Sequence, residues 1–132
     1  MERDGRTWGR ALAPGRFCRS PISRARCYSA ECAACQKHLV SGNNDDAAVT
    51  ECNGWQSVQA YAEVTVDGTG LVLCHYPFRT WRDMGKGVIN LHGHSHGRLK
   101  SLPRQFDVGV DVWDFRPVVL ADVIGKTKAR RK

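Results

Sequence analysis

The chain has 132 residues, a formal net charge of +7 and 42% hydrophobic residues. This length suits one domain with a modest core and is short for a two-layer enzyme with a complete active site of its own. No apolar stretch approaches the roughly 20 residues that a membrane span needs, and the start of the chain lacks the apolar segment of a secretory signal, so a soluble cytoplasmic protein without membrane contact is expected.

The positive charge lies at the two ends of the chain. Residues 1–30 hold seven Arg against Glu2 and Asp4, a net charge of +5, and a basic tail at 126–132 adds +5. The intervening residues must then carry 7 − 10 = −3, a mildly acidic balance that suits a cation-binding domain. A protein that binds nucleic acid through its basic ends is one alternative, and nucleic acid is otherwise expected only as a substrate.

Residues 1–35 form an Arg-rich leader without an apolar period of 2 or 3.6. Disorder is predicted for this leader. An organelle transit peptide is a less favoured interpretation, because Glu2, Asp4 and Pro14 interrupt any amphipathic helix.

Six cysteines would suggest disulfides in a secreted protein, but without a signal peptide reduced thiols are expected. Cys74 follows an apolar run and has the pattern of an ordinary buried residue. Cys32 and Cys35, with Cys27 and His38 nearby, have the spacing of half a tetrahedral zinc site. A small zinc-binding module is therefore a second alternative.

Short strands separated by turns are predicted within residues 36–125, an α/β domain. The predicted strands are 38–40, 55–66, 71–73, 88–91, 107–112 and 117–120. Asp67-Gly68 is typical of a hairpin turn between the second and third of these strands. Asp107 and Asp111, on the fifth, are expected to make structural hydrogen bonds rather than to take part in catalysis.

Side chains that can bind metal follow three of these strands. Asn43 follows the first, His75 the third, and His94 and His96 the fourth. Ligands at the ends of adjacent strands converge on a rigid support, so a metal site is predicted. An amide oxygen with imidazoles suits Mn, Fe, Zn or Ni, and two such ions about 3.5–4 Å apart would serve phosphate-ester hydrolysis.

Three ordered motifs in this region resemble the last three motifs of the calcineurin-like metallophosphoesterases. Those motifs usually read G-N-H-D/E, a lone His after an apolar strand, and G-H-x-H. Here they read Gly42-Asn43-Asn44-Asp45, His75 and Gly93-His94-Ser95-His96, and the context is similar to a branch of small bacterial and phage phosphoesterases. The resemblance covers residues 36–123 and implies part of a sandwich of mixed β-sheets flanked by helices.

The resemblance implies a hydrolase that acts on phosphate mono- or diesters with two divalent metal ions. It implies that Asn43, His75 and His94 bind one ion and that His96 contributes to the other. His92 lies outside this ligand set and is expected to support it or to be structural.

The position that approaches the leaving group is Asn44, where most members of the family have a His that acts as general acid. Asparagine cannot donate and regain a proton near neutral pH, so slow turnover is expected. The resemblance implies that Asp45 orients this position. Arg79 and Arg98 are candidates for binding the substrate phosphate, although an exposed Arg is more often only solvated.

The first motifs of the family, D-x-H and G-D-x-x-D, have no counterpart in residues 1–35. The chain is therefore expected to correspond to the C-terminal half of a phosphoesterase behind an unrelated leader. One ion would keep up to three protein ligands and the other only His96, so low or no activity alone is expected. A homodimer or a complementing chain, and a non-catalytic metal-binding remnant, are the related alternatives.

Overall fold

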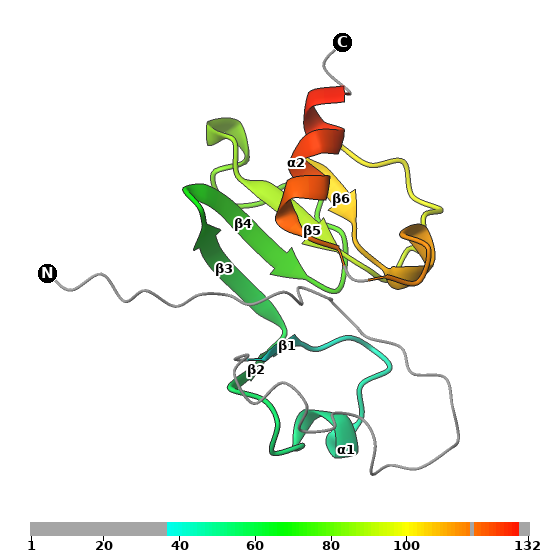
Figure 1. Cartoon of the computed structure of the whole chain (residues 1–132). Helices are drawn as coiled ribbons and strands as arrows, with labels where there is room; N and C mark the ends of the chain where they lie inside the picture. Colours follow the sequence, from blue (N-terminus) through cyan, green and yellow to red (C-terminus); the bar gives the residue numbers. More distant parts are fainter. Residues whose placement is uncertain (1–36, 117, 130–132) are drawn as a thin grey trace, which may run out of the picture.

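Two open β-sheets and a few helices make up a mixed α/β fold (Figure 1). The computed structural model describes residues 37–116 and 118–129. In the smaller sheet, β1 (His38–Val40) pairs in parallel with β2 (Ser57–Gln59). The larger sheet has the order β3-β4-β5-β6, with bounds Tyr61–Val66, Thr69–Cys74, Ile89–His92 and Gln105–Asp107. The predicted α/β class is confirmed at this level.

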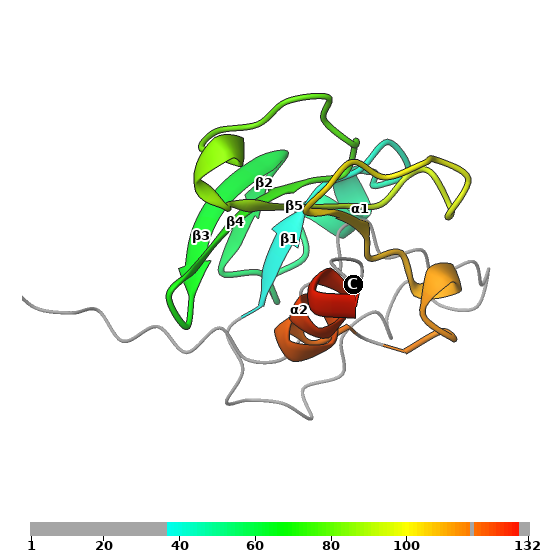
Figure 2. The same cartoon turned by 90° about the horizontal axis from the view of Figure 1, so that it is seen from above.

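The helices are α1 (Ala47–Thr50), two 3-10 helices, η2 (Met84–Lys86) and η3 (Val110–Val112), and α2 (Leu120–Ala129). Figure 2 shows α2 on one face of the larger sheet. Val123 of α2 and the preceding Val118 are buried in the core there, with Leu120 packed against it.

The turn between β3 and β4 is the predicted hairpin. The two strands are antiparallel, with Val66 opposite Thr69. Asp67 and Gly68 both have positive φ, 48° and 76°. A two-residue hairpin turn with φ > 0 at both central positions favours Asp-Gly, which explains why this element was predictable from sequence.

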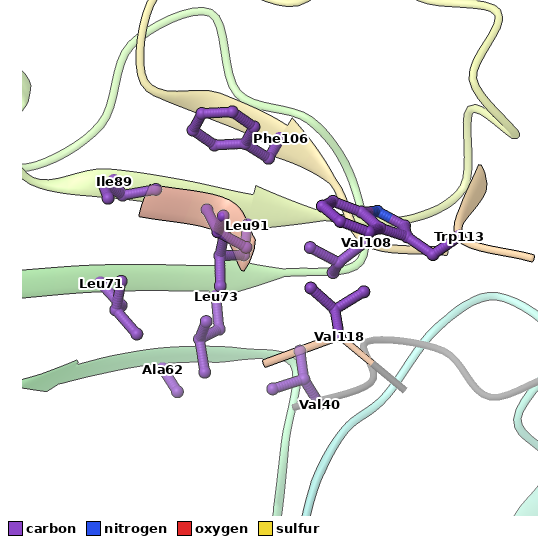
Figure 3. Packing of buried hydrophobic residues seen from close by; sticks show 11 residues of the cluster. Val40, Ala62, Leu71, Leu73, Ile89, Leu91, Phe106, Val108, Trp113 and Val118 are labelled. Carbon is purple, nitrogen blue, oxygen red and sulfur yellow. The ribbon is translucent and has the colours of Figure 1, made fainter. Parts of the chain in front are cut away.

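The core lies on the face of the larger sheet that α2 covers (Figure 2), and Figure 3 shows its side chains. Alternate residues of β4 and β5 enter it, because successive side chains of a strand point to opposite faces. The cluster comprises Val40, Ala62, Leu71, Leu73, Ile89, Leu91, Phe106, Val108, Trp113, Val118 and Val123. Val72 and Asn90, on the opposite face, are also buried, so both faces of the central strands are covered.

The strand predicted over 55–66 is wrong in extent. Its residues form β2 and β3, which belong to different sheets. The inward residues of β3 are Ala62 and the partly buried Val64 and Val66, whereas Tyr61 is exposed. The chain leaves one sheet and enters the other at Ala60, and this change interrupts the alternation of the sequence.

The strands predicted over 107–112 and 117–120 are also wrong. Strand β6 ends at Asp107, whose carboxylate accepts the Gly109 N–H at 2.9 Å and so turns the chain out of the sheet. The residues that continue the Asp/Val alternation, Val110–Val112, form η3. Leu120 begins α2, and residue 117 lies outside the described residues.

Cys74 is buried, as predicted, and among the described residues Cys52 and Cys74 form no disulfide. His38 lies in β1, where its Nδ1 is 2.6 Å from Ser57 Oγ. The predictions for the leader, including a zinc module with Cys27, Cys32 and Cys35, fall outside the described residues. Within residues 37–116 and 118–129, no helix has the length and apolar character to cross a membrane.

Candidate metal centre

Three of the predicted donor side chains come together from three strand ends. Asn43 follows β1, His75 follows β4, and His94 follows β5 by two residues. Strands β4 and β5 are parallel, so their carboxyl ends lie at the same edge of the sheet. The turn after β1 brings Asn43 to that edge from the smaller sheet.

The donor atoms of these side chains are mutually close. His75 Nε2 lies 2.6 Å from Asn43 Oδ1 and 3.2 Å from His94 Nδ1. His94 Nδ1 is also 3.2 Å from Asn43 Oδ1. Ligands about 2.0–2.2 Å from one ion are separated by roughly 3 Å when they are neighbours in its coordination shell. The spacing fits three donors on one side of an ion, and it is also within the range of hydrogen-bond distances.

The amide of Asn43 is essential to this arrangement. Within the described part of the chain, no three His, Cys, Asp or Glu side chains are grouped closely enough to hold a metal ion. A site here therefore uses two imidazoles and one amide oxygen, a donor set that suits transition metals better than Ca²⁺ or Mg²⁺.

The His75 ring packs against the backbone of Gly42. A Cβ atom at position 42 would lie only 2.7 Å from His75 Nδ1 and 2.8 Å from Cγ. The ring is buried, and its Nδ1 has no hydrogen-bond partner among the described residues. The backbone around His75 is fixed as well, because its carbonyl accepts the Gly93 N–H at 3.0 Å.

Burial is the main reason why the pKa of His75 lies below its ordinary value, and the neighbouring His94 adds to the effect. Asp45 acts in the opposite direction. The neutral imidazole, which retains a lone pair, is therefore favoured at neutral pH. Metal ions bind this form of histidine.

The turn at Asn43 is closed by Asp45, whose Oδ2 accepts the Gly42 N–H at 2.7 Å. Asn44 is exposed at the tip of this turn. The contact of Asp45 is thus with the backbone, and its orientation of Asn44 stays a prediction.

The loop after β5 has unusual backbone geometry. His94 and His96 have φ of 61° and 48°, a region that side chains with a Cβ seldom adopt. Asp107 Oδ2 holds the loop by accepting from Ser95 Oγ at 3.0 Å and from Gly97 N at 2.9 Å. Asp107 therefore makes the structural hydrogen bonds expected from the sequence. Strained residues of this kind are found at binding sites more often than elsewhere.

The other predicted site residues make no described hydrogen bond to the three donors. His96 is exposed and contacts Asp111. His92 is buried, with Nδ1 2.9 Å from the Gly93 carbonyl and Nε2 without a partner among the described residues. Arg79 and Arg98 are exposed, and no described hydrogen bond joins them to Asn43, His75 or His94.

Tyr76 was not singled out from the sequence, although it directly follows His75. Its ring centroid lies 4.7 Å from that of His94 and 5.0 Å from that of His75. The side chain is 47% exposed and forms an aromatic wall beside the donor atoms. The contact of Asp111 with His96 was likewise not foreseen.

In comparisons with known proteins, no protein family and no solved structure matches the chain. The chain is 33% identical over 107 residues to the Gene 66 protein of Mycobacterium phage D29. The match covers 59% of this chain and 54% of the phage protein, so the chain spans about half the length of this relative. The name of the phage protein states no activity.

Proposed function

We propose that Asn43, His75 and His94 bind a divalent metal ion in a phosphoesterase-like hydrolase that acts on phosphate mono- or diesters. The observation that carries this proposal is the mutual distance of 2.6–3.2 Å between three donor atoms from three separate strand ends. The order of the motifs, similar to that of the calcineurin-like metallophosphoesterases, supplies the reaction class.

A divalent ion held here would supply Lewis-acid chemistry at a phosphoryl oxygen. The chain's own residues would hold and orient the reacting groups. Neutral His75 keeps a lone pair for the ion, and exposed Asn44 can hydrogen-bond a substrate oxygen without acting as an acid. Arg79 and Arg98 are proposed to contact the substrate phosphate. Mn, Fe, Zn and Ni fit the two imidazoles and the amide.

A second ion would need protein ligands other than Asn43, His75 and His94. His96 is the histidine that we assign to it, and no described carboxylate contacts the three donor atoms. We therefore propose low turnover by this chain alone, with a second copy or a complementing chain supplying further ligands. The two sheets would form part of the sandwich of this family. Metal binding without catalysis is the second candidate function, favoured by Asn44 at the expected acid position.

The test combines metal content by mass spectrometry with Mn²⁺-dependent hydrolysis of bis-p-nitrophenyl phosphate. We expect about one tightly held ion per chain, because a divalent ion binds tightly only where several protein donors are preformed. Asn43→Ala and His94→Ala should both lose the ion. The matched control Asn53→Ala changes an exposed asparagine outside the site and should keep it.

Wild-type metal content in both Asn43→Ala and His94→Ala would rule out the proposed ligands. A bound ion without hydrolysis, even at high protein concentration, would favour the non-catalytic candidate.

A further inference from the structure

His96 and Asp111 form a pair that makes no described hydrogen bond to the three donors. His96 Nδ1 lies 2.5 Å from Asp111 Oδ2. A carboxylate at neutral pH carries no proton and only accepts hydrogen bonds, so His96 Nδ1 is the donor. In a neutral ring this leaves Nε2 with the lone pair. The proposed metal-binding nitrogen of His94, two residues earlier, is instead Nδ1, because this atom faces Asn43 and His75.

The segment that carries Asp111 is hydrogen-bonded to the loop after β5, which carries His94 and His96. Asp107, at the start of this segment, accepts from Ser95 and Gly97 of the loop. Between the two carboxylates lies Gly109, where a Cβ atom would come within 2.8 Å of Asp111 Oδ1 and 3.0 Å of Asp107 Oδ1. The absence of a side chain at position 109 allows both carboxylates to face the loop.

Stability is a poor explanation for this pair. The side chains of His96 and Asp111 are 62% and 33% exposed, and pairs at such exposure contribute at most about 1 kcal/mol. The contact does constrain an imidazole that would otherwise rotate in solvent. A carboxylate on one ring nitrogen fixes the tautomer and the orientation of the ring, and it makes the other nitrogen a better metal ligand.

We propose that Asp111 is a positioning residue that holds His96 in the Nδ1–H tautomer, so that Nε2 is available to bind the second divalent ion, beside the one held by Asn43, His75 and His94. This inference rests on the proposed function. It adds a residue whose carboxylate does not touch the ion and acts only through His96.

Asp111→Asn tests the inference, with Asp114→Asn as the matched control. Asp114 is an exposed aspartate three residues further along, and its substitution makes the same change in charge. Long-range ¹H–¹⁵N NMR of the metal-free protein reads the tautomer of each histidine. Wild type and Asp114→Asn should show His96 protonated at Nδ1, whereas Asp111→Asn should shift the population toward Nε2–H because the amide can donate to Nδ1.

Mn²⁺ titration supplies the second readout. Asp111→Asn should weaken binding of the second Mn²⁺ ion, which we assign to His96, by about 10–100-fold, the usual effect of losing a carboxylate that orients a ligand histidine. Asp111→Glu should restore part of the affinity, and Asp114→Asn should not change it.

An unchanged tautomer in Asp111→Asn, or unchanged Mn²⁺ affinity, would overturn the positioning role. Lower thermal stability without a change of tautomer would do the same, because it would identify a purely structural contact. A wild-type protein that binds no Mn²⁺ would overturn the proposed function, and the tautomer would then decide the positioning role by itself.

Discussion

Gly42 leaves the space that the His75 ring occupies. The nearest ring atoms are 2.7–2.9 Å from the position that a Cβ atom would take, closer than real Cβ contacts. The glycine of the Gly42-Asn43-Asn44-Asp45 motif is thus explained by a close approach between the turn and the histidine. From the sequence alone, this glycine is read only as part of a turn.

Gly42→Ala is expected to displace the His75 ring. Metal donors must keep their geometry within about 0.5 Å, so we expect Mn²⁺ binding to weaken by about tenfold or more. Overpacking should also lower the free energy of unfolding by about 1–3 kcal/mol. Isothermal titration and urea denaturation measure the two effects.

The control for Gly42→Ala is Gly85→Ala. A Cβ atom at Gly85 would meet nothing within 4 Å, and this position has no positive φ. It should therefore keep wild-type Mn²⁺ affinity. Equal affinities of wild type and Gly42→Ala would mean that the ring tolerates the methyl group and that Gly42 is only a turn residue.

Buried side-chain amides join strands β5 and β6 on the face of the sheet opposite the hydrophobic core. Gln105 Nε2 donates to Phe78 O at 2.6 Å and to Asn90 Oδ1 at 2.9 Å. Asn90 Nδ2 donates in turn to Val72 O at 3.2 Å. These hydrogen bonds anchor the segment after His75 to the sheet, and hence support the backbone beside the candidate metal centre.

Gln105→Met should keep the shape of this face but remove its hydrogen bonds. The Phe78 carbonyl would lose its donor, and an unsatisfied buried group costs about 1–3 kcal/mol of unfolding free energy. Urea denaturation measures the change. Gln59→Met alters an exposed glutamine of β2 and should stay within about 0.5 kcal/mol of wild type. If the two variants were equally stable, the amide network would have no role in stability.

Elements set by local chemistry could be predicted from the sequence, and those set by long-range contacts could not. Asp67-Gly68 specifies its own turn, and the donors Asn43, His75 and His94 follow strands that were identified. The alternation over 107–112 indicated a strand because the hydrogen bond from Gly109 to the Asp107 carboxylate is not visible in a pattern of apolar residues. The pairing of His96 with Asp111 joins residues that are 15 positions apart, with His96 at positive φ, and sequence spacing encodes neither.

The candidate metal centre joins the two sheets of the molecule. Asn43 belongs to the turn after β1 of the smaller sheet, whereas His75 and His94 follow strands of the larger one. An ion bound by all three can exist only when the two sheets are packed together. Its binding free energy therefore adds to the stability of the whole described fold.

Mn²⁺ should accordingly raise the free energy of unfolding of the whole protein. At a free concentration 100 times the dissociation constant, the expected gain is about 2.7 kcal/mol. Mn²⁺ is preferable to Zn²⁺ for this test, because thiolates and imidazoles of the unfolded chain bind Zn²⁺ more tightly and would reduce the gain. Urea denaturation with and without Mn²⁺ measures the difference, and a chelator should reverse it.

Asn43→Ala should abolish the gain and Asn53→Ala should preserve it. If Asn43→Ala gained as much stability as wild type, the ion would bind elsewhere and could not link the two sheets.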